Sequence, residues 1–334
     1  MGKELGLILL LVLLHFHNAN TDSKVFCPYK CQCFTSVQVL CSDGGLLYLP
    51  RNLSREVKDF ILISSDLQYL FAHTLGDSPQ LNRLIFLNNS LRNIHAQAFE
   101  HLAELRELEI SGNPMLEHLF LGTFARLGNL SKLGLNFNKI KTVLPGIFEG
   151  LTQLKTLQMK GNIISDLPTS LFINLRNLRV LDLSQNKIRG VAGEAFSGLL
   201  TELHLEWNKI SELDDHVFFG LTKLKVLKLR GNLLTTFSDE VFGFEASSLE
   251  ELNLKGNRLR ELSSLGRLTS LNGITLSSNQ LSNLPEDIFR NVTALEYLDL
   301  SENQLTSVKI MVHFPYCYPF ITQILYIVPS CLNK

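Results

Sequence analysis

Hydrophobic and polar residues alternate in short stretches of this chain, and the stretch from Leu154 to Asn162 shows the pattern clearly. Leu157 and Met159 are separated by one polar residue, and an asparagine closes the stretch three residues later. Strict alternation is typical of a β-strand that has one face in a core and the other in solvent. The pattern therefore predicts a short strand here, with the leucine and the methionine pointing into the core.

The motif L-x-x-L-x-L-x-x-N recurs in ten copies spaced 22 to 25 residues apart. This is the signature of a leucine-rich repeat, whose units cannot bury their apolar face alone but do so when they stack. We therefore predict an α/β repeat solenoid, a leucine-rich repeat horseshoe with a parallel inner sheet. An earlier, degenerate copy has Ser65 in place of the asparagine and should give the first strand of the stack. The closing asparagines are Asn89, Asn113, Asn138, Asn162, Asn186, Asn208, Asn232, Asn257, Asn279 and Asn303.

Two columns of residues outside the alternating stretches follow the same period. Each closing asparagine should turn inward and hydrogen-bond main-chain groups of its own turn and of neighbouring repeats, because a buried unpaired polar group costs about 1–3 kcal/mol. A phenylalanine also recurs in nearly every repeat, and we interpret this column as core packing between the convex segments. Its members are Phe99, Phe124, Phe148, Phe172, Phe196, Phe218, Phe242 and Phe289.

Residues 1–20 contain Lys3, an apolar run from Leu5 to Leu14 interrupted only by Gly6, and then a short polar stretch. This order is typical of a secretory signal peptide. The run is shorter than the ~20 apolar residues that cross a bilayer. We therefore expect a cleaved signal and a secreted, extracellular chain, with an uncleaved signal anchor as the alternative.

Four cysteines lie in a segment of residues 24–56 that directly precedes the first repeat. Behind a signal peptide, such a cluster predicts disulfide bonds, for which four cysteines allow three pairings. A structural zinc site is the alternative, but the spacing fits the usual zinc ligands poorly. We interpret the segment as a cap over the apolar end of the stack. The cysteines are Cys27, Cys31, Cys33 and Cys41.

Four sequons predict N-glycosylation in a secreted chain. Asn129 and Asn291 precede a predicted strand and should lie on the rim or the convex side. Asn88 is more constrained, because it stands next to the inward Asn89. The four predicted sites are Asn52, Asn88, Asn129 and Asn291.

The repeats, about eleven in number, run unbroken over residues 57–308, and then the pattern stops. Residues 309–334 are apolar over a length that could cross a membrane, but Pro315, Pro319 and Pro329 disfavour a helix. We interpret this segment as an atypical apolar C-terminal tail. A membrane segment is an alternative that we do not favour, and a lipid-anchor signal is another.

The chemistry of the chain indicates binding rather than catalysis. It has 334 residues, 45% of them hydrophobic, and a formal net charge of −1, which indicates neither nucleic acid nor an acidic membrane as a partner. It contains no H-E-x-x-H motif, no glycine-rich phosphate loop and no nucleophile elbow. We therefore predict a non-enzymatic protein without cofactors.

The solvent-facing strand positions should form polar columns on the concave side. Ile85 and Leu87 begin the two central columns, and Glu109 and Ser111 follow. Further along, an acidic zone gives way to a basic one beside the only tryptophan, which predicts a protein-binding strip. The alternative is a solvated face with the tryptophan wedged at a turn. The predicted binding residues are Glu202, His204, Glu206, Trp207, Lys228, Arg230 and Lys255.

Three of these residues could also meet as metal ligands, because Glu202, His204 and Glu206 lie on the same face of one predicted strand. Charged concave faces of repeat proteins are common without a metal, however. We therefore predict no metal site.

Several segments carry a resemblance to a known group of proteins. They are the cap Cys27–Cys41 with the adjoining Ser42-Asp43, the stretch Leu84–Asn88 and the stretch Leu133–Asn138. In these, the chain resembles extracellular leucine-rich repeat glycoproteins with a cysteine-rich N-terminal cap. Within that group it is most similar to the non-catalytic subunit of carboxypeptidase N, with platelet glycoprotein V and leucine-rich alpha-2-glycoprotein as relatives.

The resemblance implies that Cys27 pairs with Cys33 and Cys31 with Cys41. It also implies a glycosylated carrier that binds and stabilises an extracellular protein ligand, namely the catalytic subunit of a metallocarboxypeptidase. A membrane-tethered adhesion or immune-recognition receptor, anchored by the C-terminal tail, is the alternative function.

Overall fold

A computed structural model describes residues 27–306 except 51–52, 194, 197 and 245–246. The predicted signal peptide and C-terminal tail, with Cys317 and Cys331, lie outside the described residues. The chain forms two compact units. Unit 1 comprises Met1–Lys141 and Gly146–Leu157, and unit 2 comprises Thr142–Pro145 and Gln158–Lys334.

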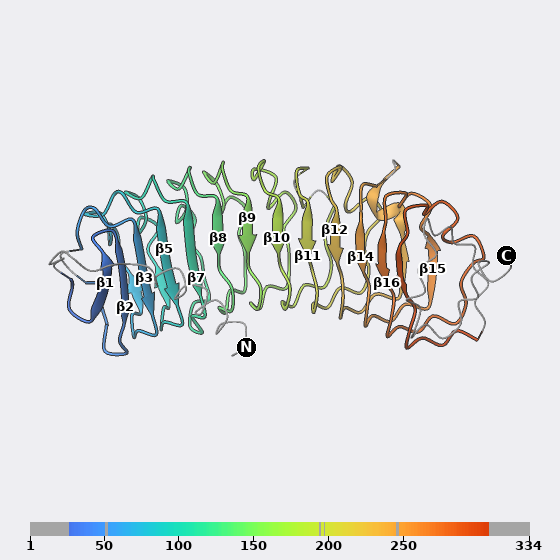
Figure 1. Ribbon diagram of the computed structural model, residues 1–334, viewed down its shortest axis with the longest axis horizontal. Helices are drawn as coiled ribbons and strands as arrows, with labels where there is room; N and C mark the ends of the chain where they lie inside the picture. Colours follow the sequence, from blue (N-terminus) through green and yellow to red (C-terminus); the bar gives the residue numbers. More distant parts are fainter. Residues whose placement is uncertain (1–26, 51–52, 194, 197, 245–246, 307–334) are drawn as a thin grey trace. The chain divides into compact units, whose positions relative to one another are not determined.

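In unit 1 each repeat contributes one strand to a main parallel sheet, and the cap adds a hairpin to its first edge (Figure 1). The second strand of the hairpin pairs in parallel with the first repeat strand. A second, two-stranded sheet consists of β4 (Tyr69–Leu70) and β6 (Asn93–Ile94). The main-sheet strands of this unit are β1 (Cys31–Thr35), β2 (Gln38–Ser42), β3 (Asp59–Ile63), β5 (Arg83–Leu87), β7 (Glu107–Ser111) and β8 (Lys132–Gly134). The boundary between the units falls within β9 (Thr156–Gln158), after Leu157.

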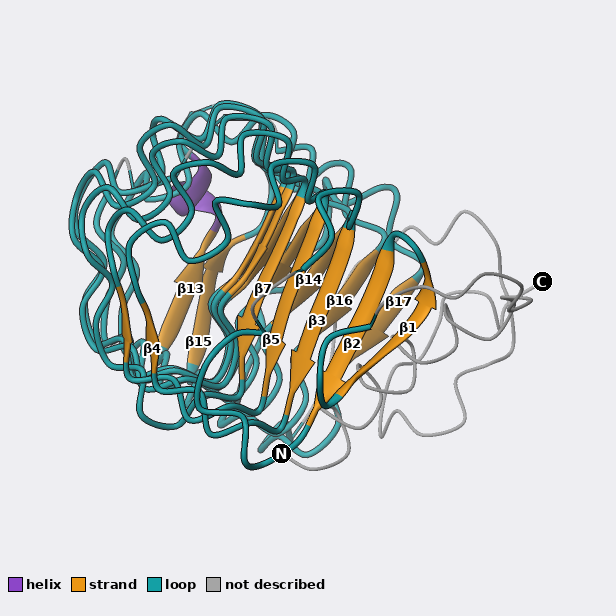
Figure 2. Cartoon of the chain, turned by 90° about the vertical axis from the view of Figure 1, so that its left-hand side faces the viewer, coloured by secondary structure: helices purple, strands orange, loops and turns teal. Residues whose placement is uncertain are grey.

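Unit 2 repeats the arrangement with six parallel strands in its main sheet. Figure 2 shows β13 (Thr236–Ser238) and β15 (Glu261–Ser264), which form a separate small sheet, on the other side of the unit from that main sheet. The 3-10 helix η1 (Asp239–Phe242) follows β13. The six main strands are β10 (Val180–Asp182), β11 (Glu202–His204), β12 (Val226–Lys228), β14 (Glu251–Asn253), β16 (Gly273–Thr275) and β17 (Tyr297–Asp299).

The register of the sheet places the motif leucines side by side under its surface. In unit 2, Leu203 of β11 lies between Leu181 of β10 and Leu227 of β12. All three side chains are fully buried. Burying one leucine contributes about 1.5–3 kcal/mol, so successive repeats stabilise each other through this shared row. The predicted leucine-rich repeat fold with a parallel inner sheet is confirmed, and the segments between its strands are mainly turns.

The predicted inward asparagines are confirmed as a hydrogen-bonded ladder, which Asn186 illustrates. Its side-chain Oδ1 accepts from the backbone N–H of Ile164 at 3.1 Å. Its Nδ2 donates to the carbonyl oxygens of Met159 and Leu183, each at 3.0 Å. One amide therefore joins its own turn to the preceding repeat. At the degenerate first copy, the Ser65 hydroxyl donates to Asn89 Oδ1 at 2.7 Å instead.

The phenylalanine column is buried, as predicted for core packing. In unit 2 the rings follow one another from repeat to repeat. The ring centroids lie 6.1 Å apart between Phe172 and Phe196, 6.0 Å between Phe196 and Phe218, and 5.7 Å between Phe218 and Phe242. Such contacts add about 0.5–1.5 kcal/mol each to the burial of apolar area, so the column stabilises the core.

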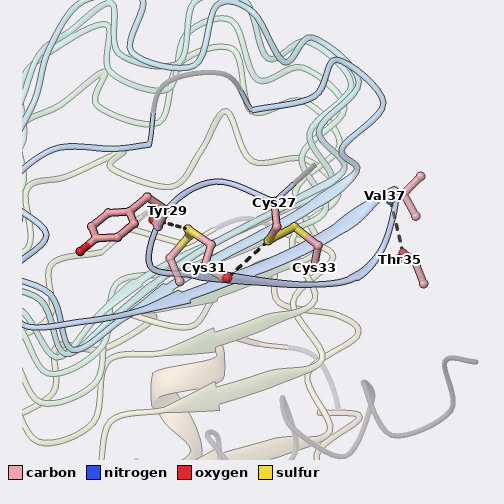
Figure 3. Close-up of a disulfide and its surroundings, with 7 residues drawn as sticks. Cys27, Tyr29, Cys31, Cys33, Thr35 and Val37 are labelled. Atoms are coloured by element: carbon pink, nitrogen blue, oxygen red, sulfur yellow. Dashed lines mark hydrogen bonds between the residues drawn. A yellow bond between two sulfur atoms is a disulfide. The ribbon is translucent and has the colours of Figure 1, made fainter. Parts of the chain in front are cut away.

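The cap contains the two disulfides that the resemblance implied. Cys27 is bonded to Cys33 (Figure 3), and Cys31 is bonded to Cys41. Cys31 and Cys41 are paired positions of the β1–β2 hairpin, and Cys41 is fully buried against the first repeat. The hairpin covers the edge of β3 that would otherwise present unpaired backbone groups. Sequence reasoning located the cap but not its strands.

The prediction that the two central strand columns face solvent is wrong for the first repeats of unit 1. Ile85 and Leu87 are 2% and 1% exposed, and Glu109 beside them is 5% exposed. The strands Asp59–Ile63 and Arg83–Leu87 are apolar on both faces. Their outward residues therefore pack together, and the resulting second apolar cluster consists of Leu40, Ile61, Ile63, Ile85 and Leu87, with Phe34 against it.

Burial has an electrostatic consequence at Glu109. It raises the pKa of the Glu109 carboxyl above its ordinary value, although a hydrogen bond from the Ser111 hydroxyl opposes the shift. On the neighbouring strand, Gly134 leaves the space that this carboxylate fills. The polar part of the predicted columns therefore begins with a buried, hydrogen-bonded group rather than a free surface charge.

Candidate protein-binding face

All seven predicted binding residues lie in unit 2, on β11, β12 and β14 or just after them (Figure 1). Alternation places Leu203 in the core, so His204 takes the solvent side of β11. In the parallel register, His204 pairs with Lys228 of β12, and Lys228 pairs with Asn253 of β14. The structure therefore brings the predicted acidic and basic zones onto neighbouring strands, as the repeat spacing indicated. We call these seven residues the Trp207 face.

The acidic zone consists of one imidazole held between two carboxylates. His204 Nε2 lies 3.4 Å from Glu202 Oε2, and His204 Nδ1 lies 3.8 Å from Glu206 Oε2. The two nitrogens of one imidazole ring point in different directions, so each carboxylate engages a separate nitrogen. The three side chains thus form an ion-pair triad rather than a shared coordination sphere.

The pKa of His204 reflects two opposing causes. Burial alone would lower it, because a charged imidazole loses solvation. The nearby carboxylate of Glu206, the negative charge of Asp182 and the hydrogen bond with Glu202 outweigh burial and raise the pKa of His204 above its ordinary value of 6.5. The protonated triad carries one positive and two negative charges, so this zone is net acidic.

Trp207 stands at the exit of β11 in an unusual backbone conformation. Its φ is 57°, in the left-handed region that non-glycine residues rarely occupy. The side chain is 52% exposed, so it is not enclosed by the turn. The Arg230 guanidinium carbon lies 5.2 Å from its ring centroid, which is within range of a cation–π contact.

The next repeat is shaped to receive the indole ring. Gly231, the equivalent of Trp207 one repeat later, has a φ of 69°, and a Cβ there would lie 2.4 Å from Trp207 Cε3. Any side chain at this position would therefore displace the ring. The Trp207 N–H also donates to the Arg230 carbonyl at 2.8 Å, which fixes the two backbones together.

The remaining residues of the face differ in how far they reach solvent. Arg230 is exposed, whereas Lys228 and Lys255 are half-buried. Within the described residues, Glu206 Oε2 is buried and has no hydrogen-bond donor. The face therefore presents an exposed aromatic–guanidinium pair and two half-buried lysines.

The predicted glycosylation sites lie at exposed positions wherever they can be seen. Asn88, Asn129 and Asn291 are exposed. Asn129 Nδ2 donates to the Ala103 carbonyl at 3.1 Å, and Asn88 has a φ of 54°. Asn52 lies outside the described residues. All four sites remain predictions.

Sequence reasoning missed a cluster in unit 1 formed by His73, Glu100 and His101. His73 and His101 are 28 residues apart, so no local motif joins them. The repeat period is the signal that could have found the cluster, because it places residue 73 beside residue 97, close to Glu100 and His101.

The family of the chain follows from a comparison with known proteins. The pattern that defines leucine rich repeats matches residues 55–115, 115–164, 153–210, 200–259 and 269–313. The chain belongs to the leucine-rich repeat family. Within this family it is related to small leucine-rich proteoglycans.

Two curated relatives and one solved structure illustrate this relationship. Mouse podocan is 29% identical over 296 residues, which cover 85% of this chain and 46% of podocan. Mouse lumican is 28% identical over 230 residues, which cover 68% of this chain and 52% of lumican. A plant peptide hormone receptor, RGFR1, solved in complex with RGF2, is 27% identical with a TM-score of 0.61 over 79% of this chain and 42% of the receptor.

The chain spans about half the length of the curated relatives it matches. Podocan and lumican do not by themselves support the closer resemblance to the carboxypeptidase N subunit. Among the residues that the structure describes, no helix is long and apolar enough to cross a membrane.

Proposed function

We propose that this leucine-rich repeat protein is an extracellular, non-enzymatic binding protein whose ligand is another protein and whose contact site is the Trp207 face. Three facts support the proposal: membership of the leucine-rich repeat family, relatedness to small leucine-rich proteoglycans, and likeness to a receptor solved with a peptide hormone. Repeat folds of this kind use extended surfaces for binding.

The observation that carries the proposal is the pairing of an exposed tryptophan with an arginine on the sheet face. Tryptophan and arginine are enriched among the residues that dominate binding energy in protein interfaces. Trp207 holds a left-handed backbone conformation that recurs at the equivalent position of the neighbouring repeats, where Gln185, Gly231 and Gly256 adopt it. Phe137, the other aromatic residue at this position, is buried, whereas the ring of Trp207 is 52% exposed and can therefore be reached by a partner.

The charges around Trp207 define the chemistry of the partner. An acidic triad borders Lys228 and Arg230, so a complementary surface carries a basic group opposite Glu202 and acidic groups opposite the two cations. Charge pairing of this kind determines orientation and association rate more than total affinity.

A finer form of the proposal rests on the resemblance of the cap and of two strand segments to the non-catalytic subunit of carboxypeptidase N. In that form, the partner is a metallocarboxypeptidase catalytic subunit, and this chain is its carrier and stabiliser.

Affinity capture with matched variants tests the proposal. The purified glycosylated protein is immobilised and exposed to plasma, and bound proteins are quantified by mass spectrometry. A double variant with Lys228→Ala and Arg230→Ala should lose the specific partner. The control double variant, Lys223→Ala with Arg189→Ala, removes the same two charge types from other exposed positions and should retain it.

Each outcome has a defined meaning. Loss of one partner only in the Lys228 and Arg230 variant, with an unchanged thermal midpoint, supports the Trp207 face. Equal capture by both variants would place the contact elsewhere. A metallocarboxypeptidase as the lost protein supports the finer form, and a different protein refutes that form alone.

A further inference from the structure

The missed cluster of unit 1 lies where the turns of two successive repeats meet. His73 follows β4, and Glu100 and His101 follow β6. These two short strands pair in parallel, and the His73 N–H donates to the Gln97 carbonyl at 3.1 Å. The two turns are therefore held side by side by backbone hydrogen bonds, independently of their side chains.

Three potential ligand atoms converge at this junction. His73 Nδ1 lies 3.1 Å from His101 Nε2 and 3.5 Å from Glu100 Oε2. All three ligand atoms lie within 4.8 Å of one another. Unlike the His204 triad, this cluster presents one nitrogen from each of two separate rings and one carboxylate oxygen to the same point.

The two separations that involve His73 are close to those between ligands of a tetrahedral zinc ion. Zinc bonds of about 2.0–2.2 Å to nitrogen and oxygen hold neighbouring ligands about 3.3–3.6 Å apart. The 3.5 Å separation lies within that interval, and the 3.1 Å separation lies about 0.2 Å below it. Two imidazoles and one carboxylate are also a donor set that zinc prefers.

We propose that His73, Glu100 and His101 form a zinc-binding site that joins the turns of two successive repeats. Water or an external ligand takes the fourth position. All three side chains reach solvent, with His73 and Glu100 exposed by 52% and 31%, so the metal has open access. Bound zinc would link segments that the sequence separates by 28 residues and would stiffen unit 1 next to the cap.

Two neighbouring residues orient the ligands. Gln97 Nε2 donates to Glu100 Oε2 at 3.3 Å, and such outer contacts orient metal-binding carboxylates. Gly76 lies beneath the His101 ring, where a Cβ would come within 3.3 Å of His101 Cδ2. The ring therefore has a defined place against the backbone of the preceding repeat.

The three side chains could also lie this close together without a metal ion, held by a hydrogen bond and an ion pair. The test must therefore distinguish these interactions from zinc binding. One imidazole N–H can donate to the other ring, and a protonated His73 can pair with Glu100. Zinc must therefore be shown to bind directly, by titrating the full glycosylated chain with Zn²⁺ alone in a calorimeter after treatment with a chelator.

The expected result is one saturable site of micromolar or tighter affinity in the wild-type protein. His73→Ala and His101→Ala should each weaken zinc binding by roughly tenfold or more. His118→Ala, which removes another exposed histidine of unit 1, should leave the affinity unchanged. Wild-type protein with no saturable zinc site would overturn the proposal, as would His101→Ala with wild-type affinity.

Two further measurements separate lost ligands from lost folding. Thermal midpoints without metal should agree among the wild type and the three variants. Co²⁺ in place of zinc should give the visible absorption bands of a four-coordinate site in the wild type and in His118→Ala, and not in His101→Ala. If a histidine variant is unstable, Glu100→Gln keeps the shape of the ligand and must still weaken zinc binding. Zinc affinity in this variant equal to that of the wild type would refute the carboxylate ligand.

Discussion

Replacing Asn186 by leucine tests whether the asparagine ladder is a principal source of stability. Leucine is more apolar than asparagine, so a simple hydrophobic account predicts a neutral or stabilising change. The structure predicts the opposite, because the amide accepts from the Ile164 N–H and donates to the carbonyls of Met159 and Leu183. The substitution removes all of these bonds at a position that is 7% exposed.

The size of the effect follows from the groups left behind. One buried donor without a partner costs about 1–3 kcal/mol, and the two carbonyls lose part of their bonding as well. The larger side chain adds roughly 1–3 kcal/mol of overpacking. Burial of the additional apolar atoms of leucine stabilises the folded state by about 1–2 kcal/mol. The net destabilisation should therefore be about 2–4 kcal/mol.

Chemical denaturation followed by circular dichroism measures this difference. Lys187→Leu is the control, because it places the same residue at an exposed position one step further along and should change stability by less than about 0.5 kcal/mol. An unfolding midpoint for Asn186→Leu equal to that of the control would refute the ladder as a source of stability.

Three further predictions concern the cap, the glycine beneath the indole ring and the histidine triad. Reduction of the two disulfides should increase hydrogen exchange in β1 and β2 before it does so in unit 2. Gly231→Ala should lower the thermal midpoint, because its Cβ would collide with the Trp207 ring. The raised pKa of His204 means that its stabilising contribution is complete below the ordinary value of 6.5 and is lost as pH rises through the folded-state value. The difference in unfolding free energy between wild type and His204→Gln should accordingly shrink with increasing pH; a constant difference would contradict the triad.

Much of the fold could be predicted because each repeat encodes the same local physics. The alternation around Leu203 determines which strand face is buried, and the period brings Asn186 next to the preceding turn. The sequence could not show which outward-facing side chains of neighbouring strands would pack against one another. Ile85 and Leu87 occupy nominally outward positions, and their burial depends on the neighbouring aliphatic residues of β2 and β3.

The residues that make up the Trp207 face could be predicted from the sequence, but most of the contacts among their side chains could not. Register placed His204 beside Lys228, as the repeat spacing indicated. The ring of Trp207 depends on the absence of a side chain at Gly231, which emerges only when the two repeats are stacked. The zinc ligands escaped sequence reasoning because they belong to turns, where the strand pattern carries no information about side-chain direction.

The most direct test of the central claim is the affinity of the captured partner for a Trp207→Gly variant. Glycine suits the left-handed backbone at this position, so the fold should remain intact while the exposed ring is removed. Loss of a dominant interface residue costs about 2 kcal/mol or more, which corresponds to roughly a thirtyfold weaker affinity. The account predicts this loss together with a folded variant. An affinity within about twofold of the wild type would contradict the assignment of binding to the Trp207 face.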